Sequence, residues 1–246
     1  MGELKSELRK LFTVRSTYYV LGLTLFLVLL IGFYIEGYRL DTKQLLDPLL
    51  LNNSITDAIN ALIALAGIVG ILLVTHEYRY NTIVYTLTAT RSRSRVFVAK
   101  ILAMSIFAVL FCVLVGFLAP LVTYLGVHAA HHGSLLVPQT LHYSDALWRL
   151  FYYGWAYVMF AVMLAVIIRN QVAAIVSLFL IPTIEQVLTL LLKDNSVYLP
   201  FSALGSLVSA PTRGSITHAH AAMVTLVYLV IGFTVAWALF QRRDAN

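Results

Sequence analysis

A polar segment rich in arginine interrupts the apolar sequence between Glu77 and Lys100. A short apolar run stands within it, flanked by the charged residues Glu77, Arg79, Arg91, Arg93 and Arg95. Apolar side chains that insert into a cleft, with charges beside them to set the register, are typical of docking to another protein. The segment therefore predicts a contact site for a soluble partner, with the inserting side chains being Ile83, Val84, Tyr85 and Leu87.

A second interpretation of this segment is open. A basic loop between two membrane spans is also what keeps a loop in the cytoplasm, and topology alone explains the arginines. It does not explain the apolar run, which is too short to cross a membrane. Local propensity disfavours a helix, because Thr82, Ile83 and Val84 are weak helix formers. A helix capped by Asn81 would nevertheless place Ile83 and Leu87 on one face.

A single carboxylate, Glu185, lies inside a long apolar run, close to Pro182 and Gln186. An ionisable side chain in a membrane helix is costly and is a functional candidate by default. Pro182 would free a backbone carbonyl and kink the helix nearby. Two roles stay open: Glu185 lines a translocation path with Gln186, or its carboxylate is hydrogen-bonded within the bundle near the outer interface.

The sequence lacks the motifs of enzymes that act in membranes. It contains no Gly-x-x-x-x-Gly-Lys-Ser/Thr loop for ATP, no Gly-x-Ser-Gly turn of a rhomboid-type protease and no His-Glu-x-x-His of a metalloprotease. Cys112 is the only cysteine, which excludes an intrachain disulfide. His128, His131 and His132 fall at helical spacing, but no carboxylate or cysteine completes a metal site beside them. We expect neither a catalytic site nor a cofactor or metal in this chain.

The composition defines the elements that carry these residues. Of 246 residues, 60% are hydrophobic and 11% charged, and the mean hydropathy is +0.86, as in chains whose solvent is lipid. We predict an all-α integral membrane protein with six transmembrane helices, since runs of this length satisfy their backbone groups only as helices. The predicted spans are roughly Tyr18 to Ile35, Ala58 to Val74, Ala99 to Leu125, Leu147 to Ile168, Val172 to Leu192 and Ala221 to Phe240.

The distribution of positive charge predicts the orientation. With six spans both termini lie on one side, and only five of the 17 Lys and Arg residues then fall on the opposite side: Arg39, Lys43, Arg149, Lys193 and Arg213. Positive loops are retained in the cytoplasm, so we place both termini there. The net charge of +6 is thus a topology signal that also attracts anionic lipid headgroups, and it does not indicate nucleic-acid binding.

Further elements are predicted around the spans. The chain forms one membrane domain, with an interfacial helix over 1–16, a six-helix bundle over 17–240 and a cytoplasmic tail over 241–246. In the interfacial helix, Leu4, Leu8, Leu11 and Phe12 form an apolar face, while Glu3, Lys5, Glu7, Arg9 and Lys10 occupy the other face. A charged leader that merely orients the first span is the alternative. The stretch 199–208 is too short to cross and predicts an outer re-entrant or interfacial element, and Ser54 is a candidate cap for the second span.

The segment from Glu77 to Lys100 resembles the first cytoplasmic loop of ABC-2-type transporter permeases. The shared pattern is an acidic residue, a basic one, a Thr, apolar positions, a polar turn with Ser-Arg, and a downstream Lys. The residues that carry it here are Glu77, Arg79, Thr82, the Ser-Arg pairs ending at Arg95, and Lys100. The resemblance extends in pattern through the six spans, the interfacial helix and the outer element.

This resemblance implies a function and a set of partners. The segment would be a coupling loop that meets a separate ABC ATPase subunit, which binds the ATP and Mg. The chain would be a permease that pairs with a second copy or a homologous permease in the cell membrane. It would export a substrate such as an amphipathic drug, peptide or lipid. The alternative is an ion-coupled secondary transporter that uses the intramembrane carboxylate Glu185.

Overall fold

The computed structural model describes residues 2–13, 15–39, 48–80, 92–130, 143–209 and 216–242. Every regular element in these ranges is a helix, which confirms the all-α prediction for the described part of the chain. In chain order they are α1 (Gly2–Thr13), α2 (Arg15–Leu27), η1 (Val28–Tyr38), α4 (Pro48–Arg79), α6 (Arg93–Ala129), α7 (Tyr143–Ile168), α8 (Gln171–Leu192), η3 (Lys193–Tyr198), α9 (Pro200–Gly205) and α10 (His218–Arg242).

Five of the described helices are long and apolar enough to cross a membrane. The qualifying stretches are Leu62–Arg79 in α4, Arg93–Ala129 in α6, Trp148–Ile168 in α7, Gln171–Leu192 in α8 and His218–Arg242 in α10. The predicted first span is also helical, as α2 followed by η1, but its apolar part, Leu21–Ile35, is shorter than the other five. The fold is therefore that of a helical, multi-pass membrane protein.

Several helices are longer than their predicted spans. The helix α4 begins at Pro48, so Ser54 lies inside it and is not its cap. Proline is well accommodated in the first turn of a helix, where no N–H is needed. The helix α6 has 37 residues and begins at Arg93, where a loop was predicted up to Ala99. At ~1.5 Å per residue this helix is longer than the ~30 Å of a hydrocarbon core, because hydropathy marks only the lipid-crossing part.

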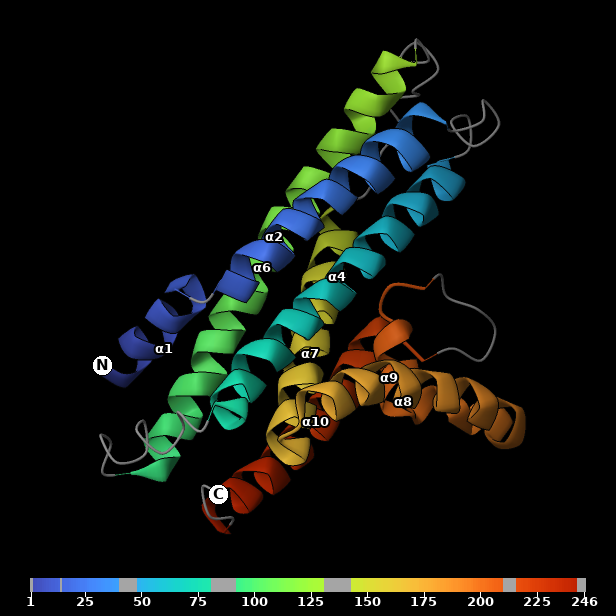
Figure 1. Cartoon of the computed structure of the whole chain (residues 1–246). Helices are drawn as coiled ribbons and strands as arrows, with labels where there is room; N and C mark the ends of the chain where they lie inside the picture. Colours follow the sequence, from blue (N-terminus) through green and yellow to red (C-terminus); the bar gives the residue numbers. More distant parts are fainter. Residues whose placement is uncertain are drawn as a thin grey trace.

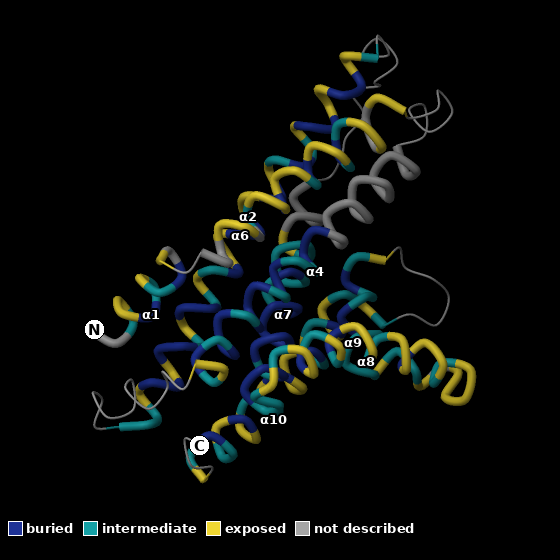
Figure 2. The backbone as a smooth tube through the Cα atoms, viewed as in Figure 1, coloured by how far each residue is buried: buried dark blue, intermediate teal, exposed yellow. Residues whose placement is uncertain are grey.

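The helix α7 lies at the centre of the bundle and is almost completely buried along 156–162 (Figure 2). Glycines let its neighbours approach closely, as is usual for helices in membranes. A methyl group added at Gly70 of α4 would lie 3.2 Å from Val162 of α7. One added at Gly154 of α7 would overlap the Cys112 sulfur of α6. At these glycines the backbone of one helix thus lies directly against a side chain of its neighbour, which brings α7 close to both α4 and α6.

Polar bonds between helices support this packing. The Trp155 indole N–H of α7 donates to the Ser105 hydroxyl of α6 over 2.7 Å. The Tyr152 hydroxyl of α7 donates to the Ala222 carbonyl of α10, also over 2.7 Å. In an apolar medium such groups need partners within the protein. The helix α7 is thus bonded on two sides.

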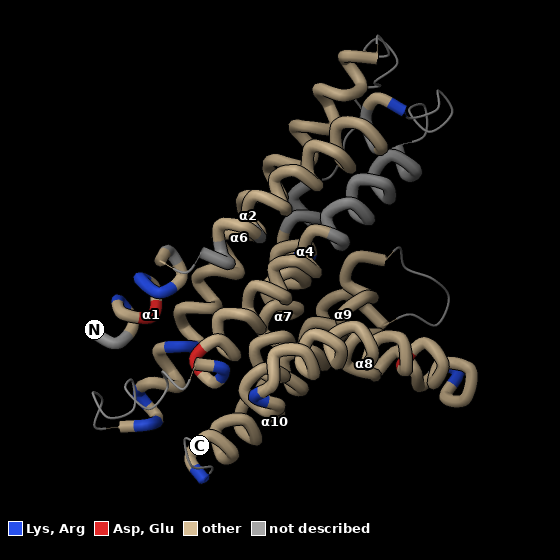
Figure 3. The backbone as a smooth tube through the Cα atoms, viewed as in Figure 1, with Lys and Arg blue, Asp and Glu red and all other residues tan. Residues whose placement is uncertain are grey.

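The outward faces of the other helices are apolar. Large side chains such as Val172 and Leu190 of α8, Phe117 of α6 and Met223 of α10 are more than half exposed. The helix α8 diverges from the direction of α2, α4 and α6, and much of it is exposed (Figures 1 and 2). The middle stretches of the long helices carry few charges (Figure 3). An apolar surface of this extent indicates that lipid is the solvent.

The two ends of the chain lie at the same end of the bundle, which we call the terminal end (Figure 1). It carries α1, the last turns of α4 and α10 and the first turn of α6. The helix α10 extends to Arg242, slightly into the predicted tail. The predicted outer element over 199–208 consists of the short helix α9 and the turn that follows it. Its position relative to the lipid stays a prediction.

Candidate functional site

The predicted coupling segment is bordered by two helix ends at the terminal end. Glu77 and Arg79 lie in the last turn of α4, and Arg93 and Arg95 lie in the first turn of α6. These two arginines are therefore helical and not part of a loop. The other predicted coupling residues lie outside the described residues: Thr82, Ile83, Val84, Tyr85, Leu87 and Arg91.

Four charged side chains meet at the terminal end and form what we call the charge cluster: Glu7, Lys10, Glu77 and Lys100. The Lys10 ammonium lies 2.6 Å from an oxygen of Glu7 and 2.6 Å from an oxygen of Glu77. The Lys100 ammonium lies 3.0 Å from the other oxygen of each carboxylate. Each carboxylate therefore contacts both ammonium groups, and the formal charge of the cluster is zero.

The charge cluster is buried from solvent. Glu7, Glu77 and Lys100 are each 5% exposed, whereas the Lys10 side chain is 35% exposed. Three of the four contacts are hydrogen bonds as well as ion pairs: Lys10 to Glu7, Lys10 to Glu77 and Lys100 to Glu7. The contact between Lys100 and Glu77 is an ion pair without hydrogen-bond geometry. Burying single charges is costly, and mutual compensation of this kind is what makes it tolerable. The cluster fixes three helices, α1, α4 and α6, to one another.

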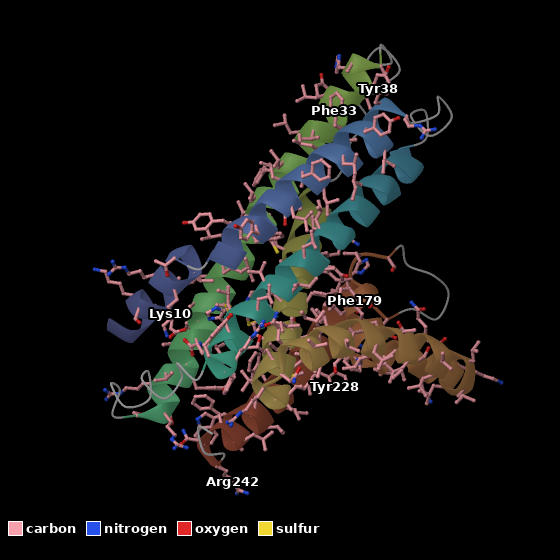
Figure 4. All side chains as sticks on the ribbon, in the orientation of Figure 1. Lys10, Phe33, Tyr38, Phe179, Tyr228 and Arg242 are labelled. Carbon is pink, nitrogen blue, oxygen red and sulfur yellow. The ribbon has the colours of Figure 1, made fainter. Side chains whose placement is uncertain are left out.

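A helix is present over Gly2–Thr13, within the predicted interfacial element, whose position at the membrane interface stays a prediction. The roles of its faces are only partly as expected. Leu11 is buried and Leu4 and Leu8 pack against the core, so the apolar face contacts the bundle. Glu7 was expected on the polar face and is instead buried. The reason lies in the spacing, because Glu7 comes three residues after Leu4 and four before Leu11 and therefore lies at the edge of the same helical stripe. Figure 4 shows Lys10 near the terminal end of the bundle.

A second set of contacts ties the start of α6 to the end of α10. The Arg93 guanidinium donates to the Gln241 carbonyl over 3.1 Å, and the Gln241 side-chain amide donates to the Ser94 hydroxyl over 2.6 Å. The rings of Phe97 and Phe240 lie 5.5 Å apart. By contrast, Arg79 and Arg95 are exposed. The site therefore has anchored charges, which hold helices together, and exposed charges, which are available to a partner or to lipid.

The buried carboxylate Glu185 caps a short helix. Its two oxygens accept hydrogen bonds from the backbone N–H of Phe201 (3.1 Å), and from the backbone N–H (2.8 Å) and hydroxyl (3.1 Å) of Ser202. These N–H groups belong to the first turn of α9, which lacks partners within its own helix. Glu185 is therefore hydrogen-bonded within the protein, which is one of the two roles that the sequence left open for it. Pro182 lies within α8 and Gln186 is exposed, and their place on a translocation path stays a prediction.

A histidine joins three elements beside α9. His218 at the start of α10 lies with Nε2 2.8 Å from an Arg149 nitrogen of α7 and with Nδ1 3.1 Å from the Ser206 carbonyl. Arginine only donates, so Nε2 must accept and Nδ1 must carry the proton. This assigns the neutral Nδ1–H tautomer to His218. The histidine thus acts as a polar link between the starts of α7 and α10 and the end of α9.

No group of three or more His, Cys, Asp or Glu residues with the arrangement of a metal site occurs among the described residues. His128 lies in the last turn of α6, whereas His131, His132 and His142 lie outside the described residues. Nothing in the described contacts resembles a nucleophile with its base. The contacts of the described residues at the terminal end hold helices together.

Sequence reasoning found Glu77 and Lys100 as parts of one pattern but missed that Glu7 and Lys10 complete the charge cluster. One signal was available. Glu7 lies on the apolar stripe of α1, and a carboxylate on such a stripe requires a cationic partner. The identity of that partner depends on tertiary packing and could not be deduced from the sequence.

Comparison with known proteins places the chain in a family. A helical, multi-pass membrane protein is the class that the fold defines. The chain belongs to the family described as protein of unknown function DUF2705, whose family model matches residues 31–245. Comparison with curated proteins gives no match. The family match includes Glu77, Lys100 and Glu185, whereas α1 with Glu7 and Lys10 precedes it.

Proposed function

We propose that this chain is the membrane subunit of an ABC-2-type transporter, energised by a separate ATPase subunit that binds ATP and Mg. The observation that supports this most is the anchoring of both flanks of the segment 81–91. Its first flank contains Glu77 in the charge cluster, and its second contains Arg93 bonded to α10 and Lys100 in the cluster. A displacement of these two flanks passes to several helices at once.

In this proposal the ATPase contacts the segment 81–91 through Ile83, Val84, Tyr85 and Leu87. Movement of the ATPase displaces the last turn of α4 and the first turn of α6. Because α1 is joined to both helices through the charge cluster, and α10 is joined to α6, the displacement reaches the bundle as a unit. Packed helices respond to such a displacement by shifting between discrete arrangements.

The proposal includes the topology and the assembly. All six predicted spans cross the plasma membrane, and α2 together with η1 forms the first of them. Both termini then lie in the cytoplasm. The Lys and Arg distribution supports this orientation, since basic residues gather at the terminal end (Figure 3). The chain pairs with a second permease, identical or homologous. The substrate is carried between them and exported, and an amphipathic drug, peptide or lipid suits the apolar bundle.

The experiment that tests the proposal is affinity purification of the chain from its native membrane in mild detergent, with every co-purifying protein identified and quantified. We expect an ATPase with a Gly-x-x-x-x-Gly-Lys-Ser/Thr loop at near-equal stoichiometry. Recovery of the intact chain without such an ATPase would contradict the proposal. That result would favour the ion-coupled carrier built around Glu185.

A further inference from the structure

An open groove of about 400 Å³ follows one side of α1. It is lined by Lys5, Ser6, Arg9, Lys10 and Thr13. Its volume falls within the ~300–1,000 Å³ that is usual for sites of small ligands or headgroups. Each of these described lining residues carries a cation or a hydroxyl, so the groove is suited to an anion.

Two of the three cations of the groove, Lys5 and Arg9, are available for such a ligand. Lys5 and Arg9 are exposed, and neither takes part in the ion pairs formed between described residues. Arginine binds phosphate oxygens in a two-pronged geometry, and lysine adds a point charge. The Thr13 hydroxyl already donates to the carbonyls of Arg9 and Lys10. The Ser6 hydroxyl adds a neutral donor among the cations.

The groove faces away from the bundle, because the opposite side of α1 packs on the core through Leu4, Leu8 and Leu11. The helix α2 follows α1 directly, and its side chains Tyr19, Leu23 and Phe26 are exposed. Basic residues also gather around the terminal end, on α1, α6 and α10 (Figure 3). The groove thus carries cations on a helix that contacts the apolar helix α2. That combination fits an amphipathic anion.

We propose that this groove binds the phosphate headgroup of an anionic phospholipid whose acyl chains lie along α2. The site does not depend on the proposed ATPase. Lys10 belongs both to the groove and to the charge cluster, where it bridges Glu7 and Glu77. A bound phosphate therefore shares Lys10 with the two carboxylates. Lipid binding is in this way linked to the contact between α1 and α4.

The test uses the full chain in phosphatidylcholine nanodiscs that contain a small fraction of phosphatidylglycerol. The association constant for phosphatidylglycerol relative to phosphatidylcholine is measured with a spin-labelled lipid of each type. We expect the wild type to prefer phosphatidylglycerol. In the Lys5→Gln/Arg9→Gln variant, the ratio of the two association constants should be roughly tenfold lower. Both residues are exposed, so this variant should fold. The charge-conserving variant Lys5→Arg/Arg9→Lys should keep most of the preference.

The matched control is Arg95→Gln/Arg242→Gln, which removes two exposed cations from the same end of the bundle but outside the groove. It should change the preference by less than about twofold, since a groove site depends on local contacts and not on total charge. An equal loss of preference in both double variants would overturn the proposal and favour diffuse electrostatic attraction of the lipid to the whole end of the bundle. A wild type that does not prefer phosphatidylglycerol would also overturn the proposal. Displacement of the labelled lipid by inorganic phosphate at similar concentration would instead identify a site for free anions and contradict a lipid site.

Discussion

Glu77 and Glu185 are both buried carboxylates, but the molecule compensates their charges in different ways. Glu77 is paired with two ammonium groups, and one of them, Lys10, is 67 residues away in the sequence. Glu185 accepts bonds from the backbone of a helix that begins 15 residues further on, at Pro200. The first solution links α1, α4 and α6 into a unit, while the second fixes only the local start of α9. In this molecule one buried carboxylate thus joins distant helices, and the other caps the start of a nearby helix.

The largest effect should come from removing one cation of the charge cluster. Lys100→Met leaves two buried carboxylates with Lys10 alone, and loss of one partner of a buried ion pair costs about 3–5 kcal/mol. We expect this loss in the free energy of unfolding, measured by SDS titration of the purified protein. The double variant Glu77→Gln/Lys100→Met restores charge balance and should recover most of the loss. Unchanged stability of Lys100→Met would show that the cluster does not hold α1 in place.

The same substitution at the two carboxylates sharpens the comparison. Glu77→Gln leaves Lys10 and Lys100 to share Glu7, and we expect it to cost about 3 kcal/mol of unfolding free energy. Glu185→Gln keeps an acceptor for one backbone N–H of α9, so we expect it to cost about 1 kcal/mol of unfolding free energy.

SDS titration of both variants under identical conditions measures the difference, and Ser202→Ala serves as a control that removes a single hydroxyl bond to Glu185. A larger loss for Glu185→Gln than for Glu77→Gln would reverse the ranking. It would mean that the cap of α9, and not the charge cluster, is the more important of the two contacts.

The helices were predictable because long apolar runs in lipid have few alternatives to a helix. A short connection between α7 and α8 was predictable for the same reason, since the predicted spans leave only residues 169–171 between them. In the structure α8 begins one residue earlier, at Gln171, and Asn170 caps it by accepting from the Ala173 N–H. The ends of α4 and α6 were not predictable, since hydropathy does not distinguish a helix that continues beyond the lipid from a loop. The partners of Glu7 and Glu185 were not predictable either, because both contacts depend on how helices pack.

The central claim is that the segment between α4 and α6 is the contact to a motor subunit. The measurement that tests it most directly compares how much of the ATPase co-purifies with the wild type and with the Ile83→Asp/Leu87→Asp variant. Ser209→Asp/Thr217→Asp provides a control with the same change in charge at two exposed positions next to α9 and α10. We predict that the ATPase is retained by the wild type and the control and lost from the Ile83→Asp/Leu87→Asp variant, which still inserts into the membrane. Full retention of the ATPase by that variant would contradict the claim.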